Sequence, residues 1–415
     1  MNWIHLLSKI HIFFGVLLFF LLAVFPFQWY ILKLFIIILF TFVSIILNKL
    51  KINYETFGLF TVFILHGIFW VSLGIINGKA EENSYLFTTA VYILFPLFYF
   101  YIGVLICSNK NTLRIILKYG LKYALFGCIG FMIYIGLSFL NIVPKSEIFL
   151  LQDGFINASL SEGSLGIKYH GITSLIFIMP FYISKSISIN FKFSIFQTLR
   201  VTFIVLLFLF IAVITSRRAL ILCILISPFL HYIIKKLILD GFLDFVYLVL
   251  LISPLVIGFS FYLFTENSSE LDDSVVIVGS DDSDDVRTKQ LNALLDLWVQ
   301  SPILGTGHGV KASIERNEKP WRYELSYIAL LAHVGLLGSL LYLVGVFYIY
   351  ARLFSIYKST LDNNIISILV AFTCILVSYS SNPYLDALDT QWTFFLPFYY
   401  IMNYSLNGHS FFNQV

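Results

Sequence analysis

Residues 201–214 read VTFIVLLFLFIAVI, residues 215–218 read TSRR, and residues 219–234 read ALILCILISPFLHYII. An apolar run of about 20 residues crosses the roughly 30 Å hydrocarbon core of a bilayer as one helix. The region therefore predicts two membrane helices joined by a tight turn that carries Arg217 and Arg218. A charge beside hydrocarbon costs about 3 kcal/mol unless water or an anion receives it, so the arginine pair points to a site for a phosphate-bearing lipid.

The rest of the chain repeats this pattern. Of its 415 residues, 59% are hydrophobic and only 12% are charged, which excludes an ordinary soluble globular protein. The predicted fold class is all-α: a polytopic integral membrane protein of about twelve transmembrane helices, forming a single transmembrane helical domain over residues 1–415. The predicted spans are 4–25, 29–47, 57–76, 86–107, 115–140, 167–186, 198–215, 218–236, 243–264, 324–350, 363–380 and 389–406.

Lysine and arginine in the short loops set the predicted orientation, because cytoplasmic loops are enriched in these residues. The basic residues gather at the N-terminus and in the even-numbered loops, so both termini are predicted to be cytoplasmic. The net charge of +3 is too small to indicate nucleic acid binding, and no nucleic acid partner is expected.

Two large segments then fall on the extracytoplasmic side, residues 141–166 and 265–323. The second lies between spans nine and ten and is predicted to contain an amphipathic helix at about 284–300. Its apolar face is predicted from residues at helical spacing, which are Leu291, Leu294, Leu295 and Trp298.

Three side chains at this outer side are candidates for chemistry. Arg287 lies on the apolar face of the predicted loop helix, where its guanidinium either snorkels along lipid or points to an anion. Glu324 stands at the first turn of span ten, as a helix-capping carboxylate or as a general base for a sugar hydroxyl. His333, deeper in that span, is predicted to form a buried hydrogen bond. Gly335 and Ser339 are predicted to allow close helix packing.

Several motifs resemble those of the O-antigen polymerase and O-antigen ligase superfamily, the Wzy and WaaL group of membrane glycosyltransferases. They are Arg287 followed by Trp298, then SPILGTG at 301–307, YELSY at 323–327 and VGLLG at 334–338. The predicted layout, with a large outer loop between spans nine and ten, also resembles this superfamily and implies a GT-C-like arrangement.

The resemblance implies a donor glycan on undecaprenyl pyrophosphate, a membrane lipid, and no cofactor or metal. It implies pyrophosphate binding by Arg217, Arg218, Arg287 and Lys168. Trp321, Tyr323 and Tyr327 would form an acceptor groove. The ligases of the family usually present a histidine where this chain has Glu324, a departure that favours a polymerase. The catalytic base stays open between Glu324, His308 and His170.

The function expected from these features is a polymerase of O-antigen or capsule repeat units in a bacterial inner membrane. A flippase and a chain-length regulator of the same pathway are expected partners. The first alternative is an O-antigen ligase that transfers glycan to lipid A core, completing lipopolysaccharide. The second is a lipid-linked oligosaccharide flippase or transporter, although the chain lacks the repeat symmetry typical of transporters.

Overall fold

The computed structural model describes residues 3–26, 28–47, 50, 52–77, 82–139, 142, 156–161, 164–169, 171–188, 195–215, 217–240, 281–313, 323–380 and 388–407. Its first half contains α1 (Trp3–Val24), α2 (Tyr30–Ile46), α3 (Tyr54–Ile76), α4 (Glu82–Thr89), the π-helix η1 (Ala90–Leu94), α5 (Phe95–Cys107), α6 (Lys110–Ile115), the π-helix η2 (Ile116–Gly120), α7 (Leu121–Phe139), β1 (Ile156–Ser161) and β2 (Ser164–Tyr169). Its second half contains α8 (Ile172–Ser188), α9 (Ile195–Ile214), α10 (Arg218–Asp240), α12 (Asp281–Gln300), α13 (Ser326–Thr360), α14 (Asn363–Tyr379), the 3₁₀ helix η6 (Leu388–Thr390) and α15 (Trp392–Asn407).

Apolar helices long enough for a bilayer dominate the described residues. Six of them qualify by length and composition: Trp3–Val24, Tyr54–Ile76, Ser84–Cys107, Lys110–Ser138, Arg218–Ile238 and Ser326–Thr360. Four shorter apolar helices accompany them, at Tyr30–Ile46, Ile172–Ser188, Leu199–Ile214 and Asn363–Tyr379. The protein is thus a multi-pass membrane protein with a helical fold. The predicted span at 243–264 lies outside the described residues.

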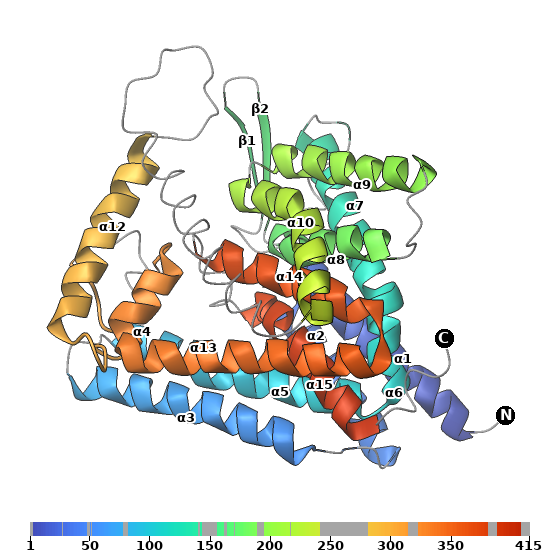
Figure 1. The fold of residues 1–415 in the computed structure, drawn as a ribbon, viewed down its shortest axis with the longest axis horizontal. Coiled ribbons are helices and arrows are strands. Elements are labelled where there is room, and N and C mark those ends of the chain that lie inside the picture. The colour runs from blue at the N-terminus through green and yellow to red at the C-terminus, as the bar shows by residue number, and fades with distance from the viewer. Residues whose placement is uncertain are drawn as a thin grey trace.

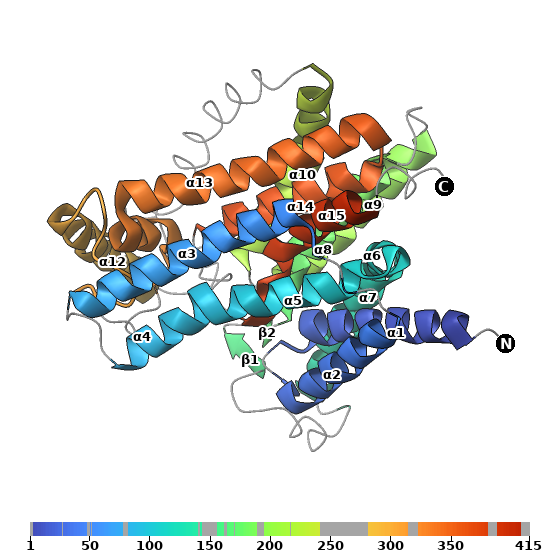
Figure 2. The ribbon, with the colours of Figure 1, turned by 90° about the horizontal axis from the view of Figure 1, so that it is seen from below.

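Helix α8 lies at the centre of the molecule, packed between α10 and α14 (Figures 1 and 2). A helix that is apolar on every side is covered either by other helices or by lipid. For α8 the cover is protein, since Leu175, Phe177 and Phe181 are fully buried. The N-terminal end of α1 and helix α12 lie at opposite ends of the molecule in both views.

The sequence prediction for residues 141–171 needs one correction. Strands β1 and β2 form an antiparallel hairpin in which Asn157 lies opposite Lys168. The predicted span 167–186 therefore starts too early, since residues 167–169 belong to β2 and the helix begins at Ile172. The alternation of polar and apolar residues in SLGIKY is a strand pattern, and the apolar run that follows it obscured the boundary.

Helix α13 runs ten residues further than the predicted span and is broken at Gly335, whose φ is 63° and ψ is −170°. The loop after α12, residues 301–313, fills the break. Its backbone pairs with the two broken ends: Thr306 N donates to Ala332 O (3.2 Å), Gly307 N to His333 O (2.8 Å), Leu336 N to Pro302 O (3.0 Å) and Leu337 N to Ile303 O (3.0 Å). Gly335 thus does more than allow close packing: it interrupts the helix, and the loop satisfies the freed groups.

The other side of this loop is fastened to α3 and α4. Four contacts do this: Trp70 Nε1 donates to Leu304 O (2.7 Å), His308 N to Trp70 O (2.9 Å), Asn77 Nδ2 to Thr306 O (2.8 Å) and Ser84 Oγ to Gly309 O (2.6 Å). The loop is therefore a brace that connects α3, α4 and α13.

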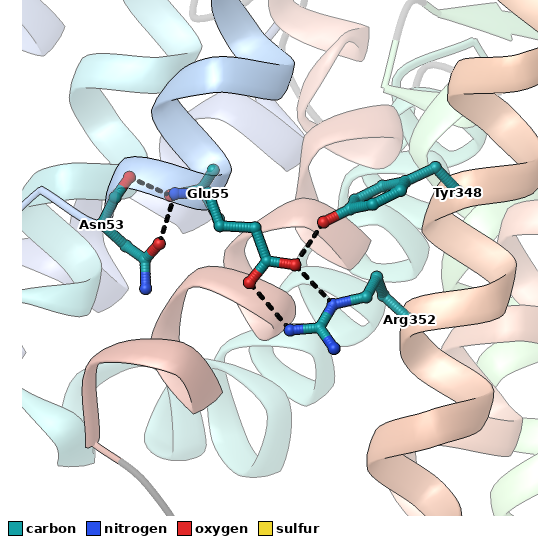
Figure 3. A network of polar contacts seen from close by, with 5 residues as sticks. Asn53, Glu55, Tyr348 and Arg352 are labelled. Atoms are coloured by element: carbon teal, nitrogen blue, oxygen red, sulfur yellow. Dashed lines mark hydrogen bonds and ion pairs between the residues drawn. The ribbon is translucent and has the colours of Figure 1, made fainter.

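A second connection joins α3 to α13 near the other end of both helices. Figure 3 shows the Glu55 carboxylate facing the guanidinium of Arg352, with Nε–Oε1 and Nη2–Oε2 distances of 2.8 Å each. The Tyr348 hydroxyl donates to the same carboxylate. Glu55 also follows the N-cap residue Asn53, so its charge favours the start of α3.

We predict that Gly335→Ala lowers stability by about 3 kcal/mol or more, because the new Cβ would lie 2.3 Å from Ile303 O at a positive φ. The thermal unfolding midpoint of the purified protein in detergent measures the change. Gly130→Ala is the matched control, since nothing lies within 4 Å of its Cβ position, and it should change stability by less than about 1 kcal/mol. Equal midpoints for the two variants would contradict the brace.

Candidate functional site

Helix α12 packs on the brace loop and on the start of α13 through a small apolar cluster. The predicted helix at 284–300 is confirmed, with bounds Asp281–Gln300. Its buried face is displaced from the predicted one: Leu294 is fully buried, but Leu295 is 36% exposed. The cluster consists of Ala293, Leu294, Leu297, Val310, Ala312, Tyr323, Ala329 and Ala332, with Trp298 partly buried against it.

This packing brings Arg287 of α12 to Glu324, which precedes α13. Arg287 Nε donates to Glu324 Oε2 at 2.6 Å, and each side chain is 22% exposed. The two residues are separated by 37 positions in the chain, and the sequence offered no signal for their pairing. Arg287 therefore points into the protein and pairs with the candidate base, rather than snorkelling along lipid.

The two tyrosines predicted to line an acceptor groove are both held by hydrogen bonds. Tyr323 is 3% exposed, and its hydroxyl accepts from Ala312 N at 2.7 Å. Tyr327 is 40% exposed, and its hydroxyl donates to Leu376 O at 2.6 Å. Trp321 lies outside the described residues.

His308 stands in the brace loop and is completely buried. Its ring stacks on Tyr92, with centroids 3.7 Å apart and an interplanar angle of 13°. Within the described residues neither ring nitrogen has a hydrogen-bond partner. Burial, aided by the nearby His333 and His66, lowers the pKa of His308 well below its ordinary value, so the ring is neutral at physiological pH. The third candidate base, His170, lies outside the described residues.

Two of the remaining predicted cations, Arg217 and Arg218, lie at the start of α10. The carbonyl oxygen of Arg217 accepts from Leu220 N and Ile221 N and so begins the helix. Arg217 is half-buried, and its Nε is buried with no hydrogen-bond partner in the part of the chain that the structure describes. Arg218 is exposed. Lys168 belongs to β2, which packs against α9.

The predicted pyrophosphate residues therefore fall into two groups. Arg287 of α12 lies with Glu324, whereas Arg217 and Arg218 stand at the start of α10, which packs on α8, α9 and α14. His333, by contrast, is placed as predicted: its Nε2 lies 2.9 Å from Val310 O in a buried hydrogen bond.

A cavity of about 480 Å³ lies among α3, η1, α5, α13, α14 and α15. Its size is within the ~300–1,000 Å³ range of small-molecule sites. The walls are almost entirely apolar and rich in aromatic rings, among them Phe60, Phe63, Tyr342, Phe394 and Phe398. Sequence reasoning missed this cavity, because it depends on which faces of six separate elements meet.

Residues 202–343 match the family model Wzy_C, described as O-antigen ligase. Over this segment the match supports the Wzy/WaaL superfamily. The segment contains Arg217, Arg218, Arg287, His308 and Glu324, whereas Lys168 and His170 lie outside it. Members of the Wzy_C family are membrane enzymes of the glycosyltransferase kind. None of the curated proteins compared with the chain matches it.

We predict that Arg287 and Glu324 stabilise the protein jointly. A double-mutant cycle of Arg287→Met and Glu324→Gln should give a coupling energy of about 1–2 kcal/mol in thermal unfolding, and high salt should reduce it. Asp296→Asn, on the exposed face of α12, is the control and should change stability by less than about 0.5 kcal/mol. Strictly additive single effects at low salt would contradict the pairing.

Proposed function

We propose that the protein is a polysaccharide polymerase of a bacterial inner membrane. Its reaction transfers a glycan from undecaprenyl pyrophosphate to a lipid-linked repeat unit on the extracytoplasmic face. The match to the Wzy_C family supports this class of enzyme. The alternative, an O-antigen ligase acting on lipid A core, is supported by the description of the matching family model.

The observation that carries the proposal is the buried, unpartnered Nε of Arg217 within the described residues. An unsatisfied buried donor costs about 1–3 kcal/mol, and more when it is charged, so the site favours an anionic ligand that accepts this hydrogen bond. The positive end of the α10 helix dipole favours the same charge. A guanidinium at a helix start therefore suits the pyrophosphate of a lipid-linked donor.

In the proposed reaction a hydroxyl oxygen of the acceptor attacks the anomeric carbon of the donor sugar. The bond from that carbon to pyrophosphate breaks, and the lipid pyrophosphate leaves with the electron pair. Arginine stabilises the negative charge that develops on the leaving group. The hydroxyl proton passes to Glu324, the candidate base at the start of α13.

In the absence of substrate, the ion pair with Arg287 occupies the Glu324 carboxylate and keeps it from acting as a base. The pyrophosphate of the lipid-linked acceptor, competing for the Arg287 guanidinium while Arg217 holds the donor, would free the Glu324 carboxylate to accept a proton. The apolar cavity of about 480 Å³ favours a substrate with a long hydrocarbon chain. Close contacts with the aromatic side chains of the cavity would stabilise the polyprenyl carbons by dispersion more than the loosely packed lipid does. A flippase and a chain-length regulator of the same pathway are the proposed partners.

We predict that Arg217→Ala reduces glycan transfer by about 10²–10³-fold, the usual cost of losing one charge-stabilising group. Arg217→Lys should recover only part of the activity, since an ammonium lacks the bidentate fork. The measurement is a gel of the surface glycan together with extraction of the lipid-linked pool. Arg200→Ala, an exposed arginine near the other end of α9, is the control and should give a normal ladder.

The same gel separates the two transferases. Loss of a polymerase leaves single repeat units on the lipid, whereas loss of a ligase leaves long polymer on the lipid. A normal ladder from Arg217→Ala would contradict both.

A further inference from the structure

A second, much smaller cavity adjoins the apolar one. Its volume is about 20 Å³, enough for one water molecule or one hydroxyl oxygen. The two cavities share four lining residues, which are Val91, Tyr92, Leu330 and Tyr379. The small cavity lies between the end of α4, the brace loop and the first turns of α13.

Most polar groups in its wall are already satisfied. Tyr323 accepts from Ala312 N, His333 bonds to Val310 O, and Thr88 Oγ1 donates to Ser84 O at 3.0 Å. Two groups are different. His308 is fully buried and Ser326 is 5% exposed, yet both ring nitrogens of His308 and the Oγ of Ser326 have no hydrogen-bond partner among the described residues.

Two unsatisfied polar side chains facing one cavity define the chemistry of its ligand. Each costs about 1–3 kcal/mol while unpaired, so a ligand that pairs them recovers that free energy. No lysine, arginine, aspartate or glutamate lines the small cavity, and His308 is held neutral. A phosphate would lie there without a counter-charge, whereas a hydroxyl group, which both donates and accepts, fits the size and the charge.

The small cavity lies next to the candidate base of the proposed reaction. Ser326 N donates to Glu324 O at 3.0 Å, so the backbone that carries the candidate base also carries one wall of the cavity. A hydroxyl bound by Ser326 would therefore fix a sugar close to the Glu324–Arg287 pair.

We propose that His308 and Ser326 form a hydrogen-bonding subsite for one uncharged hydroxyl oxygen of the substrate glycan. This inference rests on the proposed function and makes it more specific. It assigns His308 to substrate binding and leaves the role of base to Glu324. In the resting protein one water molecule occupies the same position.

Two substitutions of His308 separate binding from packing. His308→Phe keeps a ring to stack on Tyr92 and removes the hydrogen-bonding atoms, whereas His308→Gln keeps hydrogen bonding and loses the ring. A subsite predicts that His308→Phe unfolds at or above the wild-type midpoint and transfers glycan about tenfold more slowly, with His308→Gln more active than His308→Phe. A purely structural role predicts the opposite order of activity, and that order would overturn the proposal.

His66→Phe is the matched control. His66 is also a buried histidine stacked on an aromatic ring, that of Trp70 at 4.1 Å, and it lines neither cavity. It should leave transfer unchanged. Ser326→Ala should slow transfer in the same direction as His308→Phe.

A spectroscopic readout tests the subsite without relying on transfer. ¹⁵N-histidine-labelled wild-type protein in bilayers is compared with His308→Phe, which identifies the His308 signals. Addition of lipid-linked repeat units from a polymerase-deficient strain should shift these signals, whereas inorganic pyrophosphate should not.

No shift with the repeat units, or a shift with pyrophosphate alone, would overturn the subsite and leave water as the sole occupant. If Arg217→Ala transfers normally while the His308 signals still shift, the proposed function fails and the subsite stands.

Discussion

The structure depends on one constraint: within a bilayer, every backbone N–H and C=O group needs a partner inside the protein. The backbone hydrogen bonds of helix α13 are interrupted at Gly335. This break is compatible with the membrane only because the loop at 301–307 forms hydrogen bonds with the backbone groups on both sides of it. The same loop is bound by Trp70 of α3 and by Asn77, the C-cap residue of that helix. The break and the loop therefore have to fold together, and they fix α3, α12 and α13 relative to one another.

This arrangement also determines where charge lies. The brace loop carries His308 into the protein interior, where burial keeps the imidazole neutral. The charged pair, Arg287 and Glu324, lies further out and retains partial exposure. Charges are costly to bury, whereas a neutral polar group is costly only when it lacks a hydrogen-bond partner. The candidate site is accordingly divided into a charged rim and a neutral interior pocket.

The sequence predicted the helical membrane class, a loop helix at about 284–300 and the hydrogen bond of His333, because each follows from local composition or periodicity. It did not predict the break at Gly335, since a glycine within an apolar run is equally consistent with an unbroken helix that packs closely against a neighbour. The partnership of Arg287 with Glu324, and the cavity at His308, were hidden for another reason. Both require contacts between segments far apart in the chain, and no periodicity encodes them.

The division between rim and interior bears on which residue takes the proton in the proposed reaction. A buried neutral imidazole with a strongly lowered pKa gains little from protonation, and its new charge would have no carboxylate in the small cavity to stabilise it. Glu324 begins as a carboxylate, and taking a proton there removes a charge instead of creating one. Its release from Arg287 also requires a competing anion, which the pyrophosphate of the lipid-linked acceptor would supply. In this scheme proton transfer is coupled to acceptor binding, because the base becomes available only when the acceptor's pyrophosphate occupies Arg287.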